Sequence, residues 1–104
     1  MRKVVQLIQA DPAHKIHELA LRLQLSPSHL QHLFKQHTGF QLGHFMLESR
    51  LLKAASLLEN SDMSVKEIAV AVGYEHTSSF TRAFERRFHI APRSYRNQGD
   101  SRNC

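Results

Sequence analysis

The chain has 104 residues, which suits one small domain, and its 14 Lys+Arg against 9 Asp+Glu give a net charge of +5. No apolar run approaches the roughly 18 residues of a membrane span, and residues 1–30 lack the apolar stretch of a secretory signal. The single cysteine, Cys104, excludes an intrachain disulfide, so we expect a cytoplasmic protein. The positive charge favours an acidic partner, above all nucleic acid.

The apolar residues recur with a helical period along the whole chain, and no stretch predicts a strand. Ser26-Pro27 is a typical helix start, and Gly39 is a typical helix end. Ser64 with Glu67 three residues later predicts a capping box. In chain order, we expect helices at about 4–10, 16–23, 27–38, 42–59, 65–72 and 76–88, and then a short turn over 92–95.

The long helix at 42–59 has apolar residues on more than one face, which indicates packing between two bodies. We therefore predict a single domain over 1–104. It would consist of a first subdomain at about 4–40, a linker helix at about 42–59, a second subdomain at about 64–96 and a flexible tail at 97–104.

The chain contains an internal repeat. Residues from Ile16 align with residues from Val65 at an offset of 49, and beyond Leu25 the offset becomes 50. Phe34 then falls on Phe84, and the simplest interpretation is two copies of a helix–turn–helix. The turn favours a left-handed residue. Gly73 suits it, whereas Gln24 in the first copy would cost about 1 kcal/mol.

Successive side chains of an α-helix are rotated by about 100° about its axis. Placed at this angle, the residues of the second helix of each copy form two chemically distinct faces. We predict that the inward residues are Phe80, Ala83, Phe84 and Phe88 in the second copy, and Leu30, Leu33, Phe34 and His37 in the first. The outward residues would be Ser78, Arg82 and Glu85, flanked by Ser79, Thr81 and Arg86, and at equivalent positions Ser28, His32 and Lys35, flanked by Gln31 and Gln36. Hydroxyls, amides and cations are the groups that bind base edges and phosphates.

Three segments carry a family resemblance: "IHELALRLQLSPSHLQHLFKQHTGF", "RLLKAASLLENSDMSVKEIAVAVGY" and "SSFTRAFERRFHIAPRSYR". From about Ile16 to Arg96 the chain resembles the DNA-binding domain of the AraC/XylS family of bacterial transcription regulators. The resemblance implies an all-α fold of seven helices, in which a long fourth helix joins two helix–turn–helix subdomains. It also implies that the third and sixth helices enter successive major-groove segments of double-stranded DNA. Activation through RNA polymerase is a further family expectation. The family often has an effector-binding or dimerisation domain N-terminal to this part, so the chain could be the C-terminal part of a longer regulator or a stand-alone regulator like the short members of the family.

The resemblance also implies roles for individual residues. The base-reading positions fall on Ser28, Gln31, His32, Thr77, Ser78, Ser79 and Arg82. The phosphate-contacting positions fall on Lys35, Arg86 and the helix N-termini. His32 stands where the family commonly has arginine, and His89 stands where it commonly has glycine. If His32 lies at DNA, we expect binding to strengthen as the pH falls through about 6.5, because a protonated imidazole adds a phosphate-neutralising charge.

Other functions remain open at this point. The chain could bind DNA without sequence preference, it could be a helical protein-interaction domain, or only its second copy could read bases. No Gly-rich phosphate loop, carboxylate pair or Ser-His-Asp pattern suggests an enzyme, and no cofactor is expected. His29 and His32 have an acceptable spacing for metal ligands, but nothing completes a site, so no metal is expected.

Overall fold

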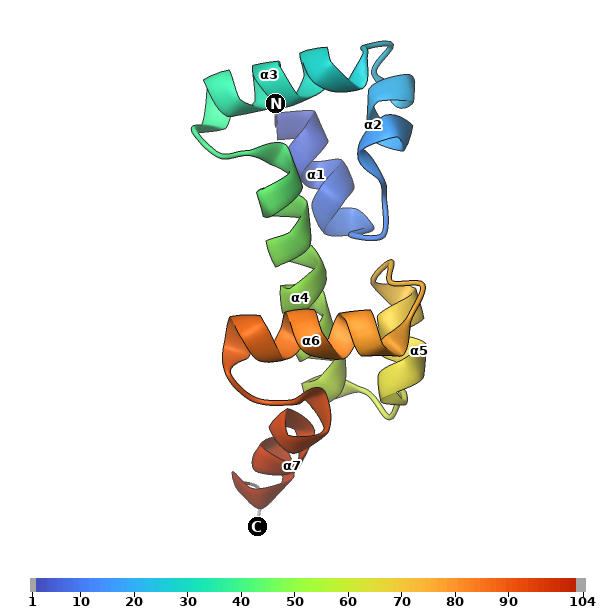
Figure 1. Cartoon of the computed structure of the whole chain (residues 1–104), viewed down its shortest axis with the longest axis vertical. Helices are drawn as coiled ribbons and strands as arrows, with labels where there is room; N and C mark the ends of the chain where they lie inside the picture. Colours follow the sequence, from blue (N-terminus) through green and yellow to red (C-terminus); the bar gives the residue numbers. More distant parts are fainter. Residues whose placement is uncertain (1, 103–104) are drawn as a thin grey trace. The chain divides into compact units, whose positions relative to one another are not determined.

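The computed structural model describes the backbone of residues 2–102 and the side chains of residues 2–98, and every regular element in that range is an α-helix (Figure 1). The helices are α1 (Arg2–Ala10), α2 (Ile16–Arg22), α3 (Pro27–Thr38), α4 (Leu42–Asn60), α5 (Val65–Ala71), α6 (Thr77–Phe88) and α7 (Pro92–Arg102). The predicted all-α fold with seven helices is confirmed. None of these helices combines the length and apolar content needed to cross a bilayer.

The chain divides into two compact units, Met1–Ser49 and Arg50–Cys104, with the boundary inside α4. Each unit has its own hydrophobic core. The core of the first unit consists of Val4, Ile8, Leu19, Ala20, Leu30, Phe34, Leu42 and Met46. The core of the second consists of Leu51, Ala54, Ala55, Leu58, Ile68, Ala69, Val72, Phe80 and Phe84. Because α4 supplies residues to both cores, it carries the two apolar faces that the sequence indicated.

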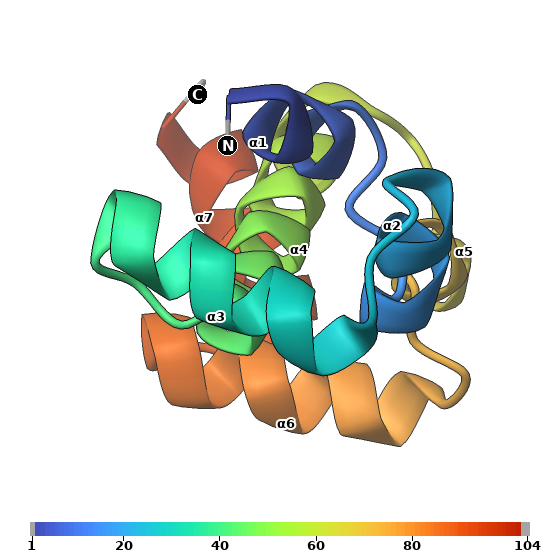
Figure 2. The same ribbon diagram turned by 90° about the horizontal axis from the view of Figure 1, so that it is seen from above.

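The repeat is wider in the structure than in the sequence alignment, because it includes the helix that precedes each helix–turn–helix. In α1 the buried residues Val4 and Ile8 correspond, at an offset of 50, to Ala54 and Leu58 in the second half of α4. Each unit therefore consists of a support helix, a helix–turn–helix pair and the start of the next helix. In the first unit these are α1, α2, α3 and the start of α4 (Figure 2).

The second helix of each helix–turn–helix, α3 or α6, is called the reading helix from here on. An aromatic contact also repeats between the reading helix and the helix that follows it. The Phe34 and Phe45 rings lie 5.4 Å apart in the first unit. At the equivalent positions in the second unit, the Phe84 and Tyr95 rings also lie 5.4 Å apart. The contact fixes each reading helix against the next helix.

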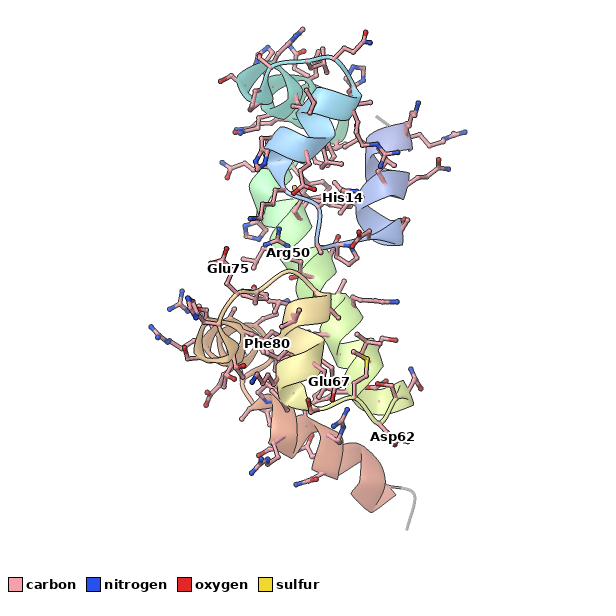
Figure 3. All side chains as sticks on the ribbon, turned by 90° about the vertical axis from the view of Figure 1, so that its right-hand side faces the viewer. His14, Arg50, Asp62, Glu67, Glu75 and Phe80 are labelled. Atoms are coloured by element: carbon pink, nitrogen blue, oxygen red, sulfur yellow. The ribbon has the colours of Figure 1, made fainter. Side chains whose placement is uncertain are left out.

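The helix ends confirm the capping predictions. The Ser26 hydroxyl accepts a hydrogen bond from the His29 backbone N–H at 3.1 Å. The Ser64 hydroxyl accepts from the Glu67 N–H at 3.0 Å, and the Glu67 carboxylate accepts from the Ser64 N–H at 3.5 Å, which completes the capping box. Figure 3 labels Glu67 at the start of α5. These bonds satisfy N–H groups that have no partner within their own helix.

The last helix differs from the prediction. The sequence predicted a turn over 92–95 and a flexible tail over 97–104, whereas α7 runs from Pro92 to Arg102. The Tyr95 hydroxyl donates to the Glu59 carboxylate, and Arg96 donates to the carbonyl oxygens of Leu58 at 3.1 Å and Ser61 at 3.2 Å. These bonds hold the start of α7 to the end of α4, and no proline follows to stop the helix. Residues 103–104 of the predicted tail lie outside the described residues.

Candidate nucleic-acid interface

The reading helix of the second unit, α6, separates apolar and polar residues as its sequence predicted. Phe80 and Phe84 are fully buried, and Ala83 and Phe88 pack against the same core (Figure 3 labels Phe80). Ser78, Ser79, Arg82 and Arg86 are exposed. The buried phenylalanines fix the rotation of α6 about its axis. The polar side chains on the opposite side of the helix therefore face solvent.

The reading helix of the first unit, α3, is arranged in the same way. Leu30 and Phe34 are fully buried and Leu33 is half-buried, whereas Ser28, Gln31, His32 and Lys35 are exposed. The prediction that His37 points inward is wrong, because its side chain is exposed. The core of the first unit contains no residue of α3 beyond Phe34, so the last turn of α3 lies outside it.

Thr77 differs from the other predicted base-reading residues. Its side chain is half-buried, and together with Thr81 it lines a groove of about 690 Å³ in the second unit. We call this the α6 groove. Its lining residues come from the start of α5, from α6 and from the start of α7: Ser64, Val65, Lys66, Thr77, Thr81, Ala91, Pro92, Arg93, Arg96 and Asn97.

A groove of about 450 Å³ occupies the equivalent place in the first unit, and we call it the α3 groove. It is lined by Ile16, Gln31, His32, Lys35, Gln41, Leu42 and Gly43. Five of its positions coincide with α6-groove positions under the repeat: Ile16 with Val65, Gln31 with Thr81, Gln41 with Ala91, Leu42 with Pro92 and Gly43 with Arg93. Neither groove has an aspartate or glutamate among its described lining residues.

Sequence reasoning missed Lys66 and Arg93. Both are exposed, and both line the α6 groove from helices other than the reading helix. The order of residues around a single helix axis says nothing of its neighbours, whereas this groove depends on how α5, α6 and α7 pack together. By contrast Arg87, which lies close to the predicted face, has its guanidinium 4.8 Å from the centre of the Phe88 ring.

Tyr74 lies in the turn before α6. Its hydroxyl is buried and has no hydrogen-bond partner among the described residues. Burial raises the pKa of the Tyr74 hydroxyl, and the nearby Arg50 guanidinium partly opposes that shift in pKa.

For metals, the described part of the chain brings together no group of three or more His, Cys, Asp or Glu side chains.

Comparison with known proteins places this arrangement in a family. The model of a family described as "Helix-turn-helix domain" matches residues 19–98. The probable transcription factor PqrA of Proteus vulgaris is 36% identical over 92 residues, which cover 88% of this chain and 75% of that protein. Two longer relatives are matched over 29% and 33% of their own lengths.

Solved structures share the whole fold. A transcriptional regulator from Chromobacterium violaceum, described by its AraC-type DNA-binding domain, superposes with a TM-score of 0.79 at 29% identity, covering 94% of this chain and 89% of that one. The DNA-binding domain of AdpA, solved with a target DNA, superposes with a TM-score of 0.85 at 27% identity, covering 97% of this chain and 93% of that one. The resemblance found in the sequence is thus confirmed. The chain belongs to the AraC-type helix–turn–helix family of DNA-binding transcriptional regulators, a family of transcription factors rather than enzymes.

Proposed function

We propose that the chain recognises a two-part site on double-stranded DNA, with α3 and α6 in successive major-groove segments. The observation that carries the proposal is the matched exposure of two reading helices. In each helix, buried phenylalanine or leucine side chains pack into the core of the unit. Hydroxyl, amide or cationic side chains occupy the solvent face at equivalent positions. An α-helix of this kind fits the major groove, where each base pair has a distinct donor and acceptor pattern.

The proposed roles follow the exposed faces. The proposed base-reading residues are the exposed Ser28, Gln31, His32, Ser78, Ser79 and Arg82, and the proposed phosphate contacts are Lys35 and Arg86. Arg82 is the residue from which we expect the largest discrimination, because a guanidinium can bond guanine O6 and N7 together. His32 at the equivalent position of α3 can form fewer such bonds.

The complex of AdpA with a target DNA supports DNA binding by this fold, because the two chains superpose over nearly their whole length. In the cell, the proposed role is regulation of bacterial transcription in the cytoplasm, by activation through RNA polymerase. An effector-binding or dimerisation domain, N-terminal to this part, belongs to the same proposal. The longer relatives support it, since this chain matches about a third of their length.

Selection of duplexes from a random library by the purified chain tests the proposal. We expect enrichment of a two-part motif whose segments lie about one helical turn, roughly 10 bp, apart. Affinity for that duplex should fall linearly in log salt, with a slope of about −0.9 for each phosphate neutralised. Replacing Arg82 with alanine should relax the preference in one segment only, whereas replacing Lys53, an exposed lysine of α4, should leave the motif unchanged.

Three other outcomes would each support a different function. Steep salt dependence without enrichment would indicate a nonspecific DNA-binding module. A single short motif would indicate that one copy alone reads bases. Absence of binding at low salt would favour a protein-interaction domain.

A further inference from the structure

We infer that the α6 groove seats one sugar–phosphate strand of the DNA, and that Lys66 and Arg93 neutralise phosphates of that strand. The inference rests on the proposed function and extends it, because it assigns backbone contacts to helices that do not read bases. Lys35 and Arg86, the phosphate contacts predicted from sequence, both lie on the reading helices.

The walls of the α6 groove carry the chemistry that a phosphate needs. Lys66 at the start of α5 and Arg93 at the start of α7 are exposed cations. Between them, α6 contributes the hydroxyls of Thr77 and Thr81. Ammonium, guanidinium and hydroxyl groups make most protein contacts to DNA phosphates. No described lining residue carries a negative charge that would repel the strand.

Arg96 also lines the groove, but its guanidinium is already engaged. It donates to the Leu58 and Ser61 carbonyl oxygens at the end of α4. We therefore assign Arg96 to the structure of the groove and not to the DNA. Lys66 and Arg93 remain as the two cations to test.

Apolar side chains complete the groove, which a purely ionic patch would not require. Val65 and Ala91 are half-buried and Pro92 is fully buried. A DNA strand presents apolar sugar carbons between its charged phosphates. A groove that combines cations and hydroxyls with short apolar side chains matches that alternation better than it matches a free anion.

The position of the groove fits a strand that borders the base pairs read by α6. Thr77 and Thr81 belong to the same helix as Ser78 and Arg82, which are exposed beside them. A strand in the α6 groove would thus flank the major-groove segment that α6 enters. This geometry reassigns Thr77 from base reading to the backbone, because its side chain is half-buried and lines the groove.

The first unit repeats the groove but not its cations. At the positions equivalent to Lys66 and Arg93 it has His17 and Gly43, and its groove is lined by Lys35 and His32 instead. The second unit should therefore supply the larger share of the backbone affinity at neutral pH.

Substitution of the two cations tests the inference on the whole chain. We expect Lys66→Gln and Arg93→Gln each to weaken binding to the selected duplex by roughly five- to tenfold, and to reduce the salt slope by about 0.9. The loss should be equal for duplexes with altered bases, because phosphate contacts carry no sequence information. Thr77→Val should weaken binding in the same uniform way, whereas Ser79→Ala should change the preferred bases.

The controls separate charge from folding and the inference from the proposed function. Lys66→Arg and Arg93→Lys keep the charge and should retain the salt slope, and thermal unfolding monitors the fold of every variant. Lys53→Gln removes an exposed lysine that does not line the groove and should change the slope least. If the library yields a motif but Lys66→Gln and Arg93→Gln behave like Lys53→Gln, the inference is wrong and the proposed function stands. If no motif is selected, the proposed function itself has failed.

Discussion

Four residues of the described chain have left-handed backbone conformations, and the repeat pairs them. Gln24 (φ 59°) corresponds to Gly73 (φ 102°) in the turn before the reading helix. Gly39 (φ 81°) corresponds to His89 (φ 63°) at the end of that helix. Each unit therefore has one glycine and one residue with a side chain at its two left-handed positions. The sequence predicted the strain at Gln24, because glycine occupies the same turn in the second copy.

Replacing Gln24 with glycine should raise the free energy of unfolding by about 0.5–1 kcal/mol, because it removes the left-handed strain at the cost of some backbone entropy. His89→Gly should act in the same direction for the same reason. Urea unfolding measures both effects. Gly73→Gln is the reciprocal control and should be destabilising; a stabilised Gly73→Gln variant would contradict the explanation.

Tyr74 has a buried hydroxyl that makes no hydrogen bond to a described residue. Tyr74→Phe removes that hydroxyl and keeps the ring that packs against Phe80, with centroids 5.6 Å apart. We expect the free energy of unfolding to stay the same or to rise by up to about 1 kcal/mol. If thermal unfolding shows that the free energy of unfolding falls by more than about 1 kcal/mol, the hydroxyl has a partner that stabilises the fold.

His32 gives the proposed DNA complex a pH dependence. Only the protonated imidazole attracts phosphate, so the bound state would take up a proton and affinity would rise as the pH falls. The described residues that line the α3 groove with it include one other ionisable group, Lys35, and the residues from α2 and α4 do not titrate. Binding to the selected duplex at about pH 5.5 and about pH 8 measures the effect. His32→Ala and His32→Arg should both lose it, and an unchanged pH profile in His32→Ala would exclude His32 as its source.

At the scale of single elements, local signals predicted the helix starts but not the full extent of the last helix. The caps at Ser26 and Ser64 depend on residues three positions apart, so their spacing is readable in the sequence. The contacts of α7 with α4 join residues 35 to 38 positions apart. No periodic pattern encodes them, and the segment after Tyr95 therefore looked like a tail.

Arg96 is the residue by which this attachment can be measured. Arg96→Ala removes two charge-assisted hydrogen bonds to carbonyl groups at the end of α4, and should lower the free energy of unfolding by about 2 kcal/mol. Arg93→Ala, on the same helix but exposed, should change stability by less than about 0.5 kcal/mol. Urea unfolding compares the two variants, and equal effects would contradict a structural role for Arg96.

At the scale of the whole molecule, the important fact is that the chain has two separate cores joined through α4. Each core is assembled within its own unit, and both include a buried phenylalanine at the same position of the repeat, Phe34 or Phe84. This organisation follows from the sequence, because one repeat unit alone supplies a support helix and a helix–turn–helix.

Separate cores predict separable local stability. Phe34→Ala should cost about 3–5 kcal/mol and should reduce amide hydrogen-exchange protection mainly in α1, α2 and α3. Phe84→Ala should act mainly on α5, α6 and α7. Loss of protection throughout both units in either variant would show that the two cores unfold as one.

By itself the sequence determined the helical class, the caps, the repeat and the inward phenylalanines, because these depend on neighbouring residues or on a pattern that occurs twice. It also determined the outward residues of α3 and α6 other than Thr81, which is half-buried, since the rotation of a helix is fixed by its apolar face. It did not determine that Thr77 turns toward a groove, that Lys66 and Arg93 meet there, or that α7 continues to Arg102. The tertiary structure alone decided these points, because they depend on how helices distant in sequence pack against one another.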